Sequence, residues 1–221
     1  MAMKQTVFQW LDERMGLTTL YTVLLDRKVP KVNWWFTLGS ANLFLFALQV
    51  LTGMMLTVYY VPSPDHAYDS IQYIMNDVAF GWLIRGVHHW GASVMVLVVF
   101  IHMVHTFTYA AYKYPREITW LSGVLLLLTT LGMGFTGYLL PWNQKAYWAT
   151  TVGTSIAGSV PFIGEFILKA LRGGTDLSAV TLARFFSVHI WWLPAAIVAI
   201  IGVHMYLVVR LGVAGPPAKD E

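Results

Sequence analysis

The chain has 221 residues, of which 57% are hydrophobic and only 11% charged, against roughly 25% charged residues in an ordinary soluble domain. This composition argues against a soluble globular fold and predicts an integral membrane protein. The formal charge of +3 comes from basic residues scattered between apolar segments, so we expect no nucleic-acid partner. The chain contains no cysteine, which excludes disulfides, thiolate metal sites and thioether attachment of a cofactor.

Apolar runs long enough to cross a bilayer, which needs about 20 residues, occur four times. We expect membrane-spanning helices at about 34–60, 86–111, 118–140 and 185–211. The segment before them, about 7–25, mixes apolar and charged side chains and predicts an amphipathic helix on the membrane surface. We expect no removable signal peptide. Residues 1–221 are thus predicted to form one all-α membrane domain, a four-transmembrane-helix bundle with an N-terminal interfacial helix.

Four spans place both termini and the turn between the second and third helices on one side of the membrane. Lys and Arg are more frequent on that side, which predicts that it is the cytoplasmic or equivalent side, here termed inner. The long connection 141–183 lies on the outer side. Because its apolar and charged residues alternate between 159 and 173, we expect a short pair of amphipathic interfacial helices there.

Two of the predicted helices each carry a pair of histidines. His88 and His102 lie on the second helix, and His189 and His204 lie on the fourth. Both spacings are close to four helical turns, so the two histidines of each helix share a face. Since the second and fourth helices run in the same direction, His88 is level with His189, and His102 is level with His204.

Two imidazoles that face each other at one depth, twice over, fit the axial ligation of haem iron. The alternative is that these histidines only form hydrogen bonds in the core of the bundle. Ionisable side chains inside a bilayer are costly and usually functional, and four of them at matched depths favour metal ligation.

The first and third helices carry a matching pair of glycines each. Gly39 and Gly53 lie on the first helix, and Gly123 and Gly137 lie on the third, again fourteen residues apart. A residue without Cβ lets a flat, bulky group approach the backbone, although small residues also serve helix packing in membranes. The running directions place Gly53 and Gly137 at the outer histidine level and the other two at the inner level, which favours macrocycles.

Further motifs accompany these residues along nearly the whole chain: residues 70–75 (SIQYIM), 80–85 (FGWLIR), 115–117 (PRE), 137–142 (GYLLPW) and 184–189 (RFFSVH). Together with the histidines they closely resemble the cytochrome b/b6 family, specifically the short cytochrome b6-type subunit of a split cytochrome b. The fifteen-residue histidine spacing on the fourth helix also points to the b6 branch.

The resemblance implies two non-covalent b-type haems with bis-His ligation. A low-potential haem is expected on the outer side between His88 and His189, and a high-potential haem on the inner side between His102 and His204. The family carries out a Q cycle as a quinol:cytochrome c or plastocyanin oxidoreductase. Quinol is oxidised near the outer haem, one electron leaves for a Rieske iron–sulfur protein and a c-type cytochrome, and the other crosses to reduce quinone.

The resemblance also implies partners and a location. We expect a subunit IV-type C-terminal half of cytochrome b, a Rieske protein and a c-type cytochrome, in a dimeric complex of the inner (plasma) or thylakoid membrane. Because the sequence ends after the fourth helix, we expect that the chain does not oxidise quinol alone. Thr37 stands where typical b6 proteins carry a cysteine, so a covalent third haem is excluded.

Haem propionates are anions and need cations nearby. Arg85 and Arg184 are the candidates for the outer haem, and Lys113 and Arg116 for the inner haem, with topogenic positive charge as the alternative.

Two aromatic residues, Tyr138 and Trp142, resemble the wall of the quinol-oxidation pocket, with an interfacial aromatic belt as the alternative. On the inner side, Asp26, Arg27 and Lys28 are candidates for proton uptake or a simple charged turn.

Two other classes of protein fit part of the pattern. A dihaem b membrane anchor of a dehydrogenase or hydrogenase also uses four helices and histidine ligands, but it lacks the Pro141-Trp142 corner and the matched glycines. A transporter uses intramembrane histidines as proton relays, but its broken helices lie near the midplane.

Overall fold

The computed structural model describes residues 6–24 and 34–215, and within these ranges every regular element is a helix. The chain divides into two compact units, residues 1–36 and 37–221. Each unit is described by itself. The prediction that residues 1–221 form one domain stays a prediction.

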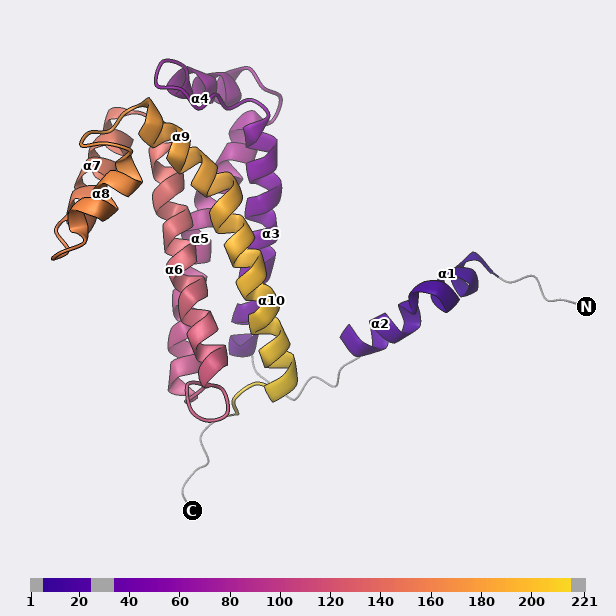
Figure 1. Ribbon diagram of the computed structural model, residues 1–221. Helices are drawn as coiled ribbons and strands as arrows, with labels where there is room; N and C mark the ends of the chain where they lie inside the picture. The colour runs from indigo at the N-terminus through magenta and orange to yellow at the C-terminus, as the bar shows by residue number, and fades with distance from the viewer. Residues whose placement is uncertain (1–5, 25–33, 216–221) are drawn as a thin grey trace, which may run out of the picture. The chain divides into compact units, whose positions relative to one another are not determined.

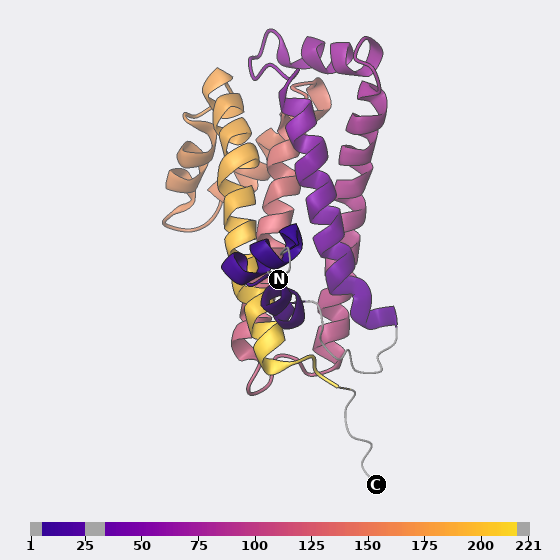
Figure 2. The ribbon, with the colours of Figure 1, turned by 90° about the vertical axis from the view of Figure 1, so that its right-hand side faces the viewer.

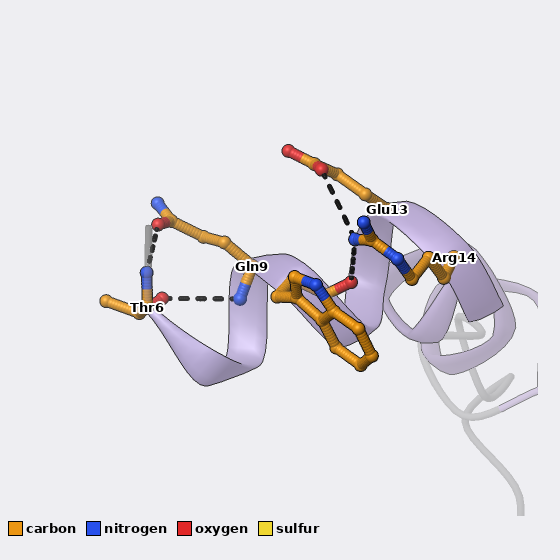
Figure 3. A network of polar contacts seen from close by, with 5 residues as sticks. Thr6, Gln9, Glu13 and Arg14 are labelled. Carbon is orange, nitrogen blue, oxygen red and sulfur yellow. Dashed lines mark hydrogen bonds and ion pairs between the residues drawn. The ribbon is translucent and has the colours of Figure 1, made fainter. Parts of the chain in front are cut away.

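The first unit contains two short helices instead of the one helix expected over about 7–25. Helix α1 spans Val7–Met15 and helix α2 spans Leu17–Leu24. At the start of α1, the Gln9 amide donates to Thr6 Oγ1 (3.2 Å) and the Thr6 amide donates to Gln9 Oε1 (2.9 Å), a reciprocal N-terminal cap (Figure 3). Gly16 ends α1 because it adopts a left-handed conformation at φ 63°.

Polar contacts join the two short helices. The Thr18 amide and hydroxyl donate to the Asp12 carboxylate at 2.5 and 2.7 Å, and these bonds lower the pKa of Asp12. The Arg14 guanidinium lies 4.2 Å from the centre of the Trp10 ring and donates to the Trp10 carbonyl (Figure 3). None of the α1 residues is buried, and large apolar side chains such as Phe8 stay exposed. This surface is the kind that a helix lying on a membrane presents to lipid.

Four helices of the described residues are long and apolar enough to cross a membrane, which confirms the predicted all-α, four-span class. They span Trp34–Thr57, Gly81–Thr108, Glu117–Leu139 and Ala179–Leu211. The first comprises the 3-10 turn η1 (Trp34–Thr37) and α3 (Leu38–Thr57). The second is α5 and the third is α6. The fourth comprises α9 (Ala179–Ser187), the π-helical turn η2 (Val188–Trp192) and α10 (Leu193–Leu211).

The second and fourth spans begin several residues earlier than the apolar runs predict, at 81 instead of 86 and at 179 instead of 185. Local backbone contacts set both starts. Before α5, Phe80 adopts a left-handed φ of 59°, and a Cβ at Gly81 would collide with the Ile74 carbonyl. At α9, Ser178 and Thr181 form a reciprocal cap. A hydropathy profile contains no information on either of these backbone features.

The long helices of the second unit lie side by side and pack mainly as two pairs, α3 with α5 and α6 with α10 (Figures 1 and 2). Helix α4 (Ala67–Asn76) crosses one end of the bundle. Helices α7 (Gln144–Gly158) and α8 (Gly164–Arg172) lie near the same end, here the outer end. Only α8 lies within the stretch 159–173 where the sequence predicts a helix pair, because α7 occupies the residues before it. The turn between α5 and α6 lies at the opposite, inner end, next to the end of α10.

A buried arginine holds this connection together. The side chain of Arg172 is only 6% exposed. Its guanidinium donates to Thr154 Oγ1 (2.8 Å), Ser155 Oγ (2.8 Å), the Thr151 carbonyl (2.8 Å) and the Thr175 carbonyl (2.6 Å). The α7–α8 segment is therefore a fixed part of the outer end, because one side chain ties α7 and α8 to the chain that leads into α9.

Candidate cofactor-binding site

The outer histidines face each other across the bundle. His88 on α5 and His189 in η2 have ring centroids 6.4 Å apart, and their planes are inclined by 74°. Two metal–nitrogen bonds of about 2.0–2.1 Å account for about 4 Å of such a separation, and the two ring half-widths account for the rest. The pair therefore fits two axial ligands of one metal.

The inner histidines form the second pair. His102 on α5 lies beside Gly39 of α3, and His204 on α10 lies beside Gly123 of α6. The described residues contain no cluster of three or more His, Cys, Asp or Glu side chains that could hold a metal ion alone. Two opposed imidazoles supply only axial ligands, so the remaining positions on a metal must come from a cofactor such as haem.

Each predicted glycine lies beside the histidine predicted for its depth. A Cβ added at Gly53 would lie 3.2 Å from His88 Cε1, and one at Gly137 would lie 2.7 Å from His189 Cε1. On the inner side the corresponding distances are 3.4 Å between Gly39 and His102 and 3.5 Å between Gly123 and His204. The structure therefore places each glycine at the depth of its predicted histidine. The group that lies closest to each glycine is the imidazole itself.

A threonine hydroxyl lies within hydrogen-bond distance of Nδ1 on each of the two outer imidazoles. Thr52 Oγ1 lies 2.9 Å from His88 Nδ1, and Thr136 Oγ1 lies 3.1 Å from His189 Nδ1. The Thr52 hydroxyl donates its single proton to the Leu48 carbonyl (2.7 Å), and the Thr136 hydroxyl donates to a carbonyl one turn earlier in the same way. A hydroxyl that donates to its backbone carbonyl accepts from the imidazole, and in that tautomer Nδ1 carries the proton and Nε2 keeps the lone pair that binds a metal.

The inner histidine His204 has the same arrangement. Ser122 Oγ lies 2.9 Å from His204 Nδ1 and donates to the Thr119 carbonyl (2.8 Å). None of these three hydroxyl residues is among the site residues predicted from the sequence. The sequence pattern that marks them is only two residues long. Each of them directly precedes one of the glycines, as Thr52-Gly53, Ser122-Gly123 and Thr136-Gly137.

A π-helical turn at His189 explains the fifteen-residue spacing on the fourth span. Fifteen residues of an ideal α-helix turn about 60° beyond four full turns, which would rotate His189 away from the face of His204. In η2 the Leu193 amide donates to the Val188 carbonyl, five residues earlier, so one extra residue is absorbed. Pro194 follows directly and lacks the amide hydrogen that a regular helix would use there.

The outer cations already have partners in the protein. The Arg85 guanidinium donates to Met75 Sδ at 3.5 Å, and the Arg184 guanidinium donates to the Ala170 carbonyl at 2.8 Å, at the end of α8. Arg184 therefore caps a helix C-terminus. The assignment of Arg85 and Arg184 to a propionate stays a prediction.

Of the two inner cations, one is exposed to solvent and the other binds the end of a helix. Lys113 is exposed in the turn between α5 and α6. Arg116 donates to the carbonyls of Gly212 (3.2 Å) and Leu211 (3.4 Å), so it joins the start of α6 to the end of α10. Whether either cation serves a propionate stays a prediction. The candidates for proton uptake, residues 26–28, lie outside the described residues.

The predicted quinol-pocket residues lie at the outer end of α6. Tyr138 is 41% exposed, and Trp142 has a left-handed φ of 50° where the chain turns from α6 into α7. The Trp142 ring packs edge-on against Tyr147 at 5.8 Å. A cavity of about 270 Å³ lies nearby between α6, α8 and the α9–η2 segment, but its lining includes Thr136 and Arg184 and neither of these two aromatic residues.

Comparisons with known proteins identify the family of the chain. A family model described as Cytochrome b/b6/petB matches residues 24–212. The menaquinol:cytochrome c reductase cytochrome b subunit of Geobacillus thermodenitrificans is 43% identical, with 97% of this chain and 100% of the relative covered. Cytochrome b6 of Prochlorococcus marinus (strain MIT 9215) is 38% identical over 98% of this chain and 100% of the relative.

A solved structure, "Hyperthermophilic respiratory Complex III", matches with a TM-score of 0.86 and 33% sequence identity. The match covers 97% of this chain and 59% of that chain, so the protein spans a little over half the length of this solved relative. With its whole length covered by such relatives, the chain belongs to the cytochrome b/b6 family.

Proposed function

We propose that this protein is the dihaem cytochrome b subunit of a quinol:cytochrome c oxidoreductase and that it carries electrons across the membrane between two quinone sites in a Q cycle. Membership of the family implies that the chain binds b-type haem. The observation that carries the finer proposal is the outer imidazole pair, with ring centroids 6.4 Å apart and with the Thr52 and Thr136 hydroxyls within hydrogen-bond distance of the two Nδ1 atoms.

The chain's own residues bind and orient the cofactors. His88 and His189 would hold one haem through Nε2 at the outer level, and His102 and His204 would hold the other at the inner level. Each haem, when bound, supplies one-electron transfer through its iron. The glycines let the imidazoles approach the backbone, and buried side chains such as Met95, Val99 and Ile197 keep water out of the layer between the two levels.

The named relatives support the substrate and partner classes. The relative from Geobacillus is named as a subunit of a menaquinol:cytochrome c reductase, so we assign a quinol as the electron donor of the complex. We expect a Rieske protein, a c-type cytochrome and a C-terminal cytochrome b half, assembled as a dimer. This chain covers the whole length of the relatives from Geobacillus and Prochlorococcus, and it spans 59% of the solved relative.

The experiment is purification of the complex in mild detergent, followed by two measurements. A pyridine haemochrome assay should give two b-type haems per chain, and a quinol:cytochrome c reductase assay should give inhibitor-sensitive turnover. Two haems without quinol:cytochrome c turnover in the intact complex would favour the dihaem anchor of a dehydrogenase or hydrogenase. The absence of haem would favour a transporter and overturn the proposal.

A further inference from the structure

Three of the four candidate ligands have a hydroxyl group at Nδ1, and the fourth has none. Thr52, Thr136 and Ser122 lie 2.9, 3.1 and 2.9 Å from the Nδ1 atoms of their histidines. His102 Nδ1, in contrast, is buried and has no hydrogen-bond partner among the residues that the structure describes. On α3, Thr52 directly precedes the outer glycine, Gly53. The residue that directly precedes the inner glycine, Gly39, is Leu38.

The outer and inner levels of the bundle therefore differ in the hydroxyl groups at their histidine Nδ1 atoms. Both outer Nδ1 atoms lie within hydrogen-bond distance of a hydroxyl group that also bonds to a backbone carbonyl. When a metal occupies Nε2, Nδ1 carries the proton and donates to that hydroxyl oxygen. At the inner level only His204 does so, through Ser122. A hydrogen bond donated by the second nitrogen of a metal-bound imidazole orients the ring and raises its basicity as a ligand.

We propose that Thr52, Thr136 and Ser122 are positioning residues that increase the electron donation of their imidazoles, and that the missing hydroxyl at His102 makes the inner haem easier to reduce than the outer one. More electron donation stabilises the oxidised metal and lowers its reduction potential. The inference rests on the proposed function, because it requires a haem at each level. It assigns the downhill direction of transfer, from outer to inner, to particular side chains of this chain.

The test is a redox titration of both haems in the intact complex, followed by visible spectroscopy. Thr136→Val removes the hydroxyl and keeps the shape of the side chain. We expect the reduction potential of the outer haem to rise by ~40 mV. At about 59 mV per tenfold for one electron, this shift corresponds to about a fivefold change in the oxidised-to-reduced ratio. The inner potential should stay unchanged. Thr52→Val should act on the same haem, and Ser122→Ala should raise the potential of the inner haem only.

Thr130→Val is the matched control. Thr130 lies on the same helix, is 5% exposed against 7% for Thr136, and donates to the Leu126 carbonyl at 2.8 Å. Among the described residues its hydroxyl bonds to this carbonyl and to no imidazole. We therefore expect Thr130→Val to leave both potentials unchanged, and Thr136→Ser, which keeps a hydroxyl, to restore the wild-type outer potential.

The outcomes separate this inference from the proposed function. Loss of the outer haem in Thr136→Val, with retention in Thr136→Ser and Thr130→Val, also supports the positioning role because Thr136→Ser keeps the hydroxyl that Thr136→Val removes. Full haem content with unchanged potentials in Thr136→Val, Thr52→Val and Ser122→Ala would overturn the inference and leave the proposed function intact. Equal shifts in Thr136→Val and Thr130→Val would overturn it as well. A wild-type chain without haem would overturn the proposed function itself.

Discussion

The glycines beside the histidines differ in how closely the imidazole approaches them. A methyl group at Gly137 would lie 2.7 Å from His189 Cε1, whereas one at Gly123 would lie 3.5 Å from His204 Cε1. The first distance forces a displacement, and the second is an ordinary contact. We predict that Gly137→Ala costs about 1–3 kcal/mol of overpacking and strongly lowers outer haem content, while Gly123→Ala keeps near-normal content.

Haem per chain in the purified variants, measured by pyridine haemochrome, checks this order. The glycines beside the other two histidines should fall between the two extremes, since their distances are 3.2 and 3.4 Å. Equal haem content in Gly137→Ala and Gly123→Ala would show that the close approach has no role in cofactor binding.

At this scale the sequence predicted the partners of each glycine but not the hydroxyl residues. Helical spacing and running direction are enough to match Gly53 with His88, because both follow from regular geometry. Thr and Ser in membrane helices commonly bond back to their own helix, as Thr130 does here. Only the three-dimensional packing distinguishes Thr136, which in addition contacts an imidazole.

At the scale of the element, the π-helical turn at 188–192 keeps His189 on the same face of the fourth span as His204. We predict that deletion of Trp191, which is 70% exposed, is tolerated, because the turn can revert to a regular α-helix and keep His189 in register. Insertion of an alanine after Trp191 should rotate His189 by about 100° and remove the outer haem. Difference spectra of the two variants check this, and an insertion variant with both haems would contradict it.

The Arg172 clamp belongs to the same scale. Hydrogen bonds to a charged donor contribute about 1.5–3 kcal/mol each, and this guanidinium makes four. We predict that Arg172→Met loosens the connection between α6 and α9, so that limited proteolysis cuts it at least tenfold faster. The inner haem spectrum should not change. Cleavage at the wild-type rate would show that apolar packing alone holds α7 and α8.

Sequence predicted the elements themselves better than their ends. Hydropathy identifies all four spans because each needs a long apolar run. The ends depend on single backbone conformations, such as the left-handed Gly16 that divides the surface helix and the left-handed Phe80 before α5. A periodic apolar pattern continues through such positions and so does not show them.

At the scale of the whole molecule, the chain has no cysteine, and the resemblance to b6 proteins places Thr37 where they carry a cysteine. We predict that all haem is extracted by acidic acetone, because no thioether bond to the protein can form. Haem-stained denaturing electrophoresis checks this. A stained band at the 24.9 kDa mass of the chain would contradict it.

The central claim is that two imidazole pairs hold two haems at separate depths. The most direct test is a set of four variants, His88→Ala, His189→Ala, His102→Ala and His204→Ala, each examined by reduced-minus-oxidised spectra during a redox titration. The account predicts that His88→Ala and His189→Ala lose the low-potential component, while His102→Ala and His204→Ala lose the high-potential one. Loss of the same component in His88→Ala and His102→Ala would contradict the pairing.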